Sequence, residues 1–139
     1  MEIKQYNEYT PLAKEVREKV FITEQGFSYD YDKTDDVATH FVAFDGEKPV
    51  GACRVFEDSE AETYVLGRLA VLKGHRFKGI GRMLIDSAKE FVKQKGGNFI
   101  ILHSQIQAKQ FYLKTGFVVF SGIEYEEDRP HIWMGMELE

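Results

Sequence analysis

Residues 65–92 read VLGRLAVLKGHRFKGIGRMLIDSAKEFV, and this stretch holds three structural signals in a row. Its first eight residues are nearly all apolar, and a run without polar alternation predicts a strand that is covered on both faces. From Gly79 onward the apolar residues recur at helical spacing, which predicts an amphipathic helix. The pair Gly96-Gly97 marks the end of that helix. The stretch therefore predicts a buried strand, a glycine-bearing turn and a helix.

The turn between this strand and this helix has the chemistry of an anion site. It reads RFKGIG over residues 76–81, and its glycines let another backbone or a ligand come close. The first turn of a helix has unpaired N–H groups at the positive end of the helix dipole. Arg76, Lys78 and Arg82 add positive charge around it. The turn therefore predicts a site for a phosphate-bearing ligand.

Two common phosphate-binding motifs do not fit this turn. Gly74 and Gly79 have the glycine spacing of a P-loop, but no Lys-Ser/Thr pair follows them. A dinucleotide fingerprint that begins at Gly79 fails because Leu84 stands where its third glycine belongs. A tight turn with a basic rim and no ligand is the alternative that the turn alone leaves open.

Length and composition limit the class of protein. The chain has 139 residues and 43% apolar residues, which suits one domain over residues 1–139 with one sizeable core. Its net charge of −5 argues against nonspecific nucleic-acid binding. No apolar run approaches the roughly 20 residues that span a membrane. The polar N-terminus lacks a signal-peptide core, so we expect a cytoplasmic location. The single cysteine, Cys53, excludes an internal disulfide framework.

Hydrophobic periodicity along the rest of the chain predicts an α/β fold. An N-cap at Thr10 and a proline at the first helical position begin a first helix. A strand, a helix and a strand in succession imply a parallel pair, whereas the early strands form a hairpin. We expect a mixed, centrally parallel-paired sheet with helices on both faces. The further strands are expected at residues 2–6, 40–44, 50–56, 99–103, 117–121 and 132–138, and a short helix at 107–115.

Two acidic segments, residues 30–36 and 122–130, are expected to be solvated loops. The first follows a mixed aromatic and acidic stretch that we interpret as a partly buried loop or broken helix over residues 21–32. An EF-hand does not fit, because Asp35 occupies its glycine position and Phe41 its terminal glutamate position. The alternative is that these acidic segments attract a cationic substrate such as a polyamine, an aminoglycoside or a lysine side chain.

Two motifs resemble the GNAT superfamily, the acyl-CoA-dependent N-acyltransferases. The turn at residues 76–81 resembles the family's R-x-x-G-x-G/A loop, and residues 108–117, AKQFYLKTGF, resemble its A-x-x-F-Y-x-x-x-G-F segment. The order of expected elements is similar to the GNAT fold from end to end. Residues 20–32, VFITEQGFSYDYD, and 130–134, PHIWM, further resemble the ElaA/YjcF-like branch. The resemblance implies an enzyme that transfers an acetyl group from acetyl-CoA to a primary amine of a small molecule or peptide by direct attack.

The resemblance also implies where coenzyme A binds. In the family the loop's backbone amides hold the pyrophosphate, and the strand before the loop pairs with the pantetheine arm. Gln105 stands where many members have asparagine. The implied coenzyme A residues are Leu69, Ala70, Val71, Arg76, Phe77, Lys78, Gly79, Ile80, Gly81, Arg82, Gln105 and Phe111. We expect no metal, because the four histidines and the one cysteine show no metal-ligand spacing.

Tyr112 is the candidate general acid. It matches the family position whose hydroxyl protonates the departing coenzyme A thiolate; a core tyrosine on a short helix is the alternative. Candidates for the general base are Glu24, whose partial burial would raise its pKa, and His131, with His40 ranked below it. A water chain to solvent is a further alternative to a dedicated base.

Two other residues have competing interpretations. Arg68 is either a buried ion-pair partner or a substrate contact. Cys53 lies in the middle of an expected strand without a neighbouring base, so core packing is favoured over an acyl-cysteine route.

Two hypotheses compete with an active acetyltransferase. One is an acyl-CoA-binding regulatory module without turnover, and the other is a structural protein with a phosphate-accepting turn and no coenzyme A function. We expect no nucleic-acid or membrane partner, and the sequence leaves a homodimer open.

Overall fold

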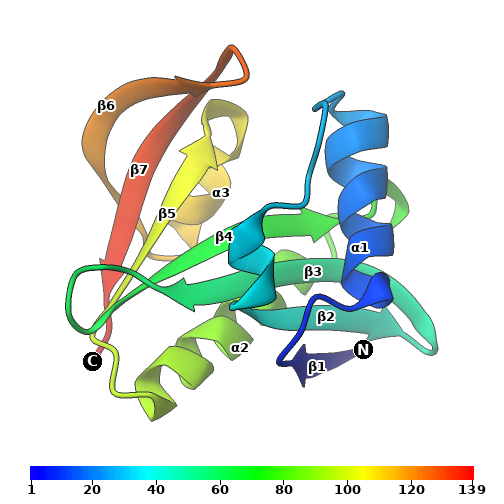
Figure 1. Cartoon of the computed structure of the whole chain (residues 1–139), viewed down its shortest axis with the longest axis horizontal. Coiled ribbons are helices and arrows are strands. Elements are labelled where there is room, and N and C mark those ends of the chain that lie inside the picture. The colour runs from blue at the N-terminus through cyan, green and yellow to red at the C-terminus, as the bar shows by residue number, and fades with distance from the viewer.

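One seven-stranded sheet runs through the molecule, in the strand order β1-β2-β3-β4-β5-β7-β6. The computed structural model describes all of residues 1–139 (Figure 1). The strands are β1 (Glu2–Tyr6), β2 (Thr39–Asp45), β3 (Lys48–Glu57), β4 (Thr63–Val71), β5 (Phe99–Gln105), β6 (Val118–Glu126) and β7 (Arg129–Glu137). The α-helices are α1 (Pro11–Arg17), α2 (Ile80–Gln94) and α3 (Lys109–Lys114), with a π-helix η1 (Glu18–Glu24) and 3-10 turns η2 (Lys33–Asp36), η3 (Lys73–His75) and η4 (Ile106–Ala108).

Strands β4 and β5 pair only at one end. They are parallel over three residue pairs, from Thr63 with Phe99 to Val65 with Ile101. Beyond Val65 the two strands diverge, and β5 pairs along its length with β7 instead (Figure 1). A register shift on β3 opposite β4 and the left-handed backbone of Arg68, with φ 51°, mark a bulge that bends β4. The predicted parallel pair is confirmed, and its short length opens the sheet at its centre.

The sheet is covered on both faces, as predicted. Helix α2 buries five apolar-face residues against one face, and each such side chain contributes roughly 1.5–3 kcal/mol when fully buried, less for alanine. Helix α1 packs Ala13 and Val16 against Val42 and Ala52 on the opposite face. Thr10 caps α1 by accepting the N–H of Leu12 at 3.1 Å, as its position before proline predicts. None of the helices is both long and apolar enough to cross a bilayer.

The expectation that residues 122–130 form an acidic loop is wrong. Strand β6 continues to Glu126 and β7 begins at Arg129, so only Glu127 and Asp128 form the turn, both with positive φ. Strand β6 lies at the edge of the sheet and most of its residues are exposed. Such a strand needs no alternation of polar and apolar residues, and this is why its sequence pattern resembled a loop.

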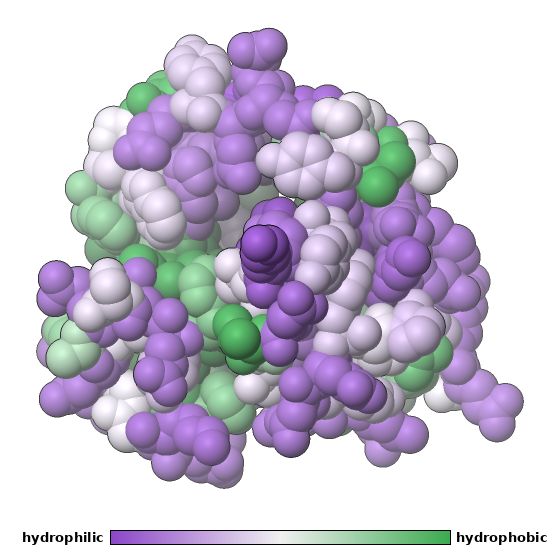
Figure 2. Space-filling model, viewed as in Figure 1, coloured by the Kyte–Doolittle hydropathy of each residue, from purple (hydrophilic) through white to green (hydrophobic).

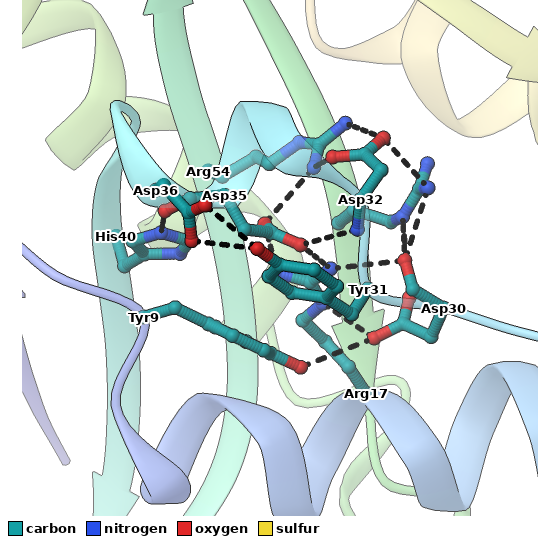
Figure 3. Close-up of polar contacts among 10 residues, drawn as sticks. Tyr9, Arg17, Asp30, Tyr31, Asp32, Asp35, Asp36, His40 and Arg54 are labelled. Atoms are coloured by element: carbon teal, nitrogen blue, oxygen red, sulfur yellow. Dashed lines mark hydrogen bonds and ion pairs between the residues drawn. The ribbon is translucent and has the colours of Figure 1, made fainter.

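The expectation that residues 30–36 form a solvated loop is also wrong. Asp30 and Asp35 are 3% and 0% exposed, and both bind the buried guanidinium of Arg17 at 2.9 and 2.8 Å (Figure 3). Arg54 bonds to Asp35 at 2.9 Å and to Asp32 at 2.6 Å. The sequence alone does not reveal this burial, because the partners of these aspartates lie 13 to 22 residues away in the sequence.

Arg68 completes a charge-balanced cluster. It donates to the carbonyl of Asp30 at 3.1 Å and to the carboxylate of Asp32 at 3.3 Å. The cluster holds three arginines, Arg17, Arg54 and Arg68, against three aspartates at 30, 32 and 35, so its formal charges cancel. The aspartates at positions 30, 32 and 35 therefore do not present a net negative charge to a cationic substrate.

Candidate active site

A cavity of about 850 Å³ lies where β4 and β5 diverge. Its volume is within the usual range of small-molecule sites, and residues from both diverging strands line it. Figure 2 shows the same view of the molecule, a largely hydrophilic face that is hollowed near its centre. The fold therefore creates the cavity through the short pairing between two parallel strands.

The N-terminus of α2 forms one end of the cavity. Gly79 precedes the helix with φ 81°, and no side chain caps the first turn. The first intrahelical bond runs from the N–H of Met83 to the carbonyl of Gly79, so the N–H groups before it lack helical partners. These open donors and the helix dipole are the physical requirements of an anion site.

Gly81 allows α3 to approach this helix start. A Cβ atom at this position would lie 2.9 Å from Cζ of Phe111, which is closer than real side chains pack. The ring of Phe111 consequently lies against the first turn of α2 and lines the cavity beside it. The two sequence motifs at residues 76–81 and 108–117 thus meet in space.

The structure brings most of the implied coenzyme A residues to this cavity. Ala70 and Lys78 do not line it, and the side chain of Ala70 is buried in the core under α1. Gln105 does line it, and its amide donates to Gln25 at 2.8 Å across the cavity end. The implied residues that line the cavity are Leu69, Val71, Arg76, Phe77, Gly79, Ile80, Gly81, Arg82, Gln105 and Phe111.

Glu24 does not have the environment expected of a general base. Both of its carboxylate oxygens bind the guanidinium of Arg76 at 2.6 Å, while Nε of Arg76 donates to the carbonyl of Val71 at 3.0 Å. The hydrogen bonds from Arg76, with its charge, lower the pKa of Glu24, against a smaller effect of burial. The expected rise in pKa is therefore wrong, and Glu24 lies outside the cavity lining.

Tyr112 lies in the wall of the cavity and is 9% exposed. The rings of Phe111 and Phe117 hold it in edge-to-face contacts at 5.2 and 5.8 Å. Burial, with a lesser contribution from Cys53, raises the pKa of the Tyr112 hydroxyl, so it keeps its proton at neutral pH. A buried tyrosine hydroxyl usually has a hydrogen-bond partner, yet no protein group bonds to this one, so its donor is available to a ligand.

A cluster of rings and carboxylates forms the other end of the cavity. His131 is 4% exposed, and its ring stacks on His103 at 4.9 Å. His103 in turn stacks on Trp133 at 4.6 Å. Glu126 approaches His103 and His131 at 3.3 and 3.6 Å, and all four side chains line the cavity.

The structure places His40, Arg68 and Cys53 in three different environments. His40 is fully buried outside the cavity, where its Nε2 donates to the carbonyl of Asp35 at 2.9 Å and burial lowers its pKa. Arg68 is an ion-pair partner that also lines the cavity. Burial raises the pKa of the Cys53 thiol, so it stays protonated and packs in the core.

Sequence reasoning missed His103, Glu126 and Trp133. The sequence pattern predicts only a strand at His103 and a loop at Glu126. Antiparallel pairing sets Trp133 opposite His103 and His131 opposite Gln105. The strand assignments at 99–103 and 132–138 could have suggested that these residues are neighbours, but the register between the strands was needed to place them.

Comparison with known proteins identifies the class to which this fold and cavity belong. A family model described as "Acetyltransferase (GNAT) domain" matches residues 5–138. The chain therefore belongs to the GNAT acetyltransferase family and is an acyltransferase enzyme. The family resemblance of its two motifs is confirmed.

Individual relatives are similar over most of the chain. The uncharacterized N-acetyltransferase YjcF of Bacillus subtilis is 37% identical over 123 residues, covering 86% of each protein. The crystal structure of Escherichia coli ElaA is 26% identical, with a TM-score of 0.85, and the match covers 98% of this chain and 99% of ElaA. An aminoglycoside 6'-N-acetyltransferase solved with coenzyme A shares the fold, with a TM-score of 0.77 at 17% identity over 99% of this chain and 97% of that one.

Proposed function

We propose that the enzyme transfers an acetyl group from acetyl-CoA to a primary amine by direct attack, with Tyr112 as general acid and His131 as general base. One observation carries this proposal. A single cavity joins an open helix N-terminus, an unbonded tyrosine hydroxyl and a histidine cluster. These are the three groups that binding an acyl-CoA, protonating a thiolate and deprotonating an amine require.

The cavity supports coenzyme A binding along its length. The first turn of α2 offers N–H donors to the pyrophosphate, and Arg82 adds positive charge, while the charge of Arg76 is paired with Glu24. Beyond Val65, the edge of β4 that faces β5 has no strand partner. Backbone groups of that edge, over Leu69 to Val71, can pair with the amides of a pantetheine arm, except the carbonyl of Val71, which accepts from Arg76.

The proposed reaction releases one net proton to solvent. An alkylammonium acceptor gives a proton to Nε2 of His131, because such an amine is almost fully charged at neutral pH. The neutral amine attacks the thioester carbonyl, a C–N bond forms, and the C–S bond breaks. The sulfur leaves with the electron pair and takes the proton of Tyr112. The nitrogen loses a second proton, which restores the Tyr112 hydroxyl through water, so one net proton leaves from His131.

The first test is the release of coenzyme A thiol from acetyl-CoA across a panel of amines. The panel includes a polyamine, an aminoglycoside and a lysine peptide, since the acceptor is unidentified. Release that depends on one amine class supports the proposed function. Binding of acetyl-CoA, seen as a raised melting temperature, without release for any amine would support the regulatory-module hypothesis instead.

Tyr112→Phe tests the general acid. A general acid contributes about 100- to 10,000-fold, so we expect kcat to fall by roughly 100-fold or more while KM for acetyl-CoA changes little. Tyr64→Phe is the matched control, because Tyr64 is also 9% exposed but lies outside the cavity. Equal activity of the Tyr112 and Tyr64 variants would contradict the assignment.

A further inference from the structure

The carboxylate of Glu126 lies between two histidines that come from different strands. Its Oε2 is 3.3 Å from Nδ1 of His103 on β5 and 3.6 Å from Nε2 of His131 on β7. Glu126 itself is the last residue of β6, and no lysine or arginine pairs with it. Three strands therefore bring one uncompensated negative charge to two imidazoles at the wall of the cavity.

Hydrogen bonding determines which nitrogen of His131 can accept a proton. Nδ1 of His131 lies 2.9 Å from the carbonyl oxygen of Arg129. A carbonyl only accepts, so Nδ1 carries the hydrogen and Nε2 keeps a lone pair in the neutral ring. Nε2 is the atom that faces Glu126. When Nε2 takes a proton, the contact with Glu126 changes from a lone pair against a carboxylate to an ion pair.

His103 holds Glu126 from the other side. A carboxylate accepts hydrogen bonds, so Nδ1 of His103 is the donor in its contact with Glu126. The ring of His103 is fixed between Trp133 and His131, with interplanar angles of 23° and 29°. Stacking thereby fixes the plane of the His103 ring, and the hydrogen bond to Glu126 selects the orientation in which Nδ1 faces that carboxylate.

The other charged groups near this cluster do not neutralise Glu126. Glu124 on β6 lies 3.6 Å from Nε2 of His103 and adds a second negative charge. The guanidinium of Arg129 on β7 lies 4.0 Å over the ring of Phe27 instead. Glu127, in the turn, binds Ser28.

We infer that Glu126 is the positioning residue that makes His131 a competent base, and that His103 holds Glu126 in place. This inference rests on the proposed function, in which His131 takes the proton of the acceptor amine. Glu126 stabilises the imidazolium that forms, and its half-exposed carboxylate passes the proton to water. The proton moves from the amine nitrogen to Nε2 of His131, then to Glu126, and then to solvent.

Glu126→Gln distinguishes this role from a structural one. The amide keeps an acceptor for His103 but removes the charge beside His131, so the imidazolium forms less readily. We expect the acid limb of the kcat/KM profile to move to lower pH by about half to one pH unit, given the partly exposed ion pair. We also expect the plateau to fall, because a weaker base removes the amine proton less efficiently. The ionisation of the amine is the same for every variant and does not affect the comparison.

Nuclear magnetic resonance measures the same coupling without turnover. The chain has four histidines, so their imidazole signals are few. We expect the nitrogen shifts of neutral His131 to report the Nδ1–H form, and its titration midpoint to be lower in Glu126→Gln than in the wild type. Asp128→Asn is the matched control, because it removes one charge from the same turn, where asparagine tolerates the φ of 62°. It should move neither the midpoint nor the acid limb.

Two substitutions of His103 separate its hydrogen bond from its stacking. His103→Asn keeps a donor near the position of Nδ1 and loses the ring, whereas His103→Phe keeps the ring on Trp133 and loses the donor. We expect the asparagine variant to retain the wild-type acid limb more closely than the phenylalanine variant does. The opposite order would overturn the positioning role of His103.

The outcomes of these measurements are separable. An unchanged His131 midpoint in Glu126→Gln overturns the inference. A moved midpoint with an unmoved acid limb also overturns it, because His131 is then not the base. If the wild-type enzyme releases no coenzyme A with any amine, the proposed function fails, and with it the catalytic role of the cluster.

Discussion

At the scale of single residues, Gly81 shows how one missing Cβ atom creates part of the site. The position lies in the first turn of α2, and the ring of Phe111 occupies the space that a side chain would fill. The missing side chain therefore lets α3 contact α2 and keeps the open N–H groups of the first turn accessible. Its φ is not in the left-handed region, so alanine is compatible with the local backbone.

We expect Gly81→Ala to weaken acetyl-CoA binding without unfolding the protein. The methyl group pushes the ring of Phe111 into the cavity, and we expect KM for acetyl-CoA to rise roughly tenfold, equivalent to about 1.4 kcal/mol. Overpacking against the partly exposed ring of Phe111 should lower the free energy of unfolding by about 1 kcal/mol. The higher helix propensity of alanine offsets part of that loss. Steady-state kinetics and urea unfolding measure the two effects. Gly74→Ala is the control, since nothing lies within 4 Å of a Cβ there; equal KM values for the two variants would contradict the argument.

At the scale of elements, residues 24–28 form a strap across the open end of the sheet. Glu24 binds Arg76 before α2, Gln25 binds Gln105 on β5, and Ser28 binds Glu127 in the β6–β7 turn. These contacts connect the end of η1 to both sides of the divergence between β4 and β5. The strap thus connects η1, which continues α1 on one face of the sheet, to the turn before α2. Helix α2 covers the opposite face.

We expect Glu24→Gln to change the binding of acetyl-CoA but not the pH dependence of catalysis. Arg76 loses a partly exposed ion pair worth about 0.2–1 kcal/mol, so KM for acetyl-CoA should rise by roughly 1.4- to fivefold. A general base would instead show a lost acid limb in the kcat/KM profile. Glu18→Gln on the same η1 helix is the control, because Glu18 is exposed and has no ion pair. A shifted pH profile in Glu24→Gln would restore Glu24 as a base candidate.

At the scale of the whole molecule, the buried arginine–aspartate cluster connects α1, β3 and β4 through η2. Arg17 is fully buried, and removing it leaves Asp30 and Asp35 without their main partner. We expect Arg17→Met to lower the free energy of unfolding by about 3–5 kcal/mol, the usual cost of breaking a buried ion pair. Urea unfolding measures it. Lys19→Met, which removes an exposed pair with Glu15 at 3.9 Å, should cost at most about 0.5 kcal/mol.

Asp35 links this cluster to acid stability. Burial alone would raise the pKa of Asp35, but its hydrogen bonds with Arg17 and Arg54 and their charges outweigh burial and lower the pKa to about 2. A lowered folded-state pKa contributes stability that is fully present above the unfolded value of 3.8 and is lost as the pH falls through about 2. The contribution is about 2 kcal/mol at neutral pH. The stability of Asp35→Asn should therefore fall less steeply than that of the wild type between pH 4 and pH 2, as followed by circular dichroism; parallel curves would contradict this role.

Local patterns in the sequence determined the glycine-bearing turn before α2, the position of Tyr112, the cap of α1 and the order of the elements. Each depends on residues within one or two turns of chain, where glycine freedom, capping and hydrophobic period act directly. Only the tertiary structure decided that residues 30–36 are buried, that Glu24 is paired with Arg76, and that Glu126 lies between His103 and His131. The partners in these contacts are 5 to 52 residues apart, and most are far more distant than one helical turn. Their meeting depends on strand register and on the divergence of β4 from β5, which no local pattern encodes.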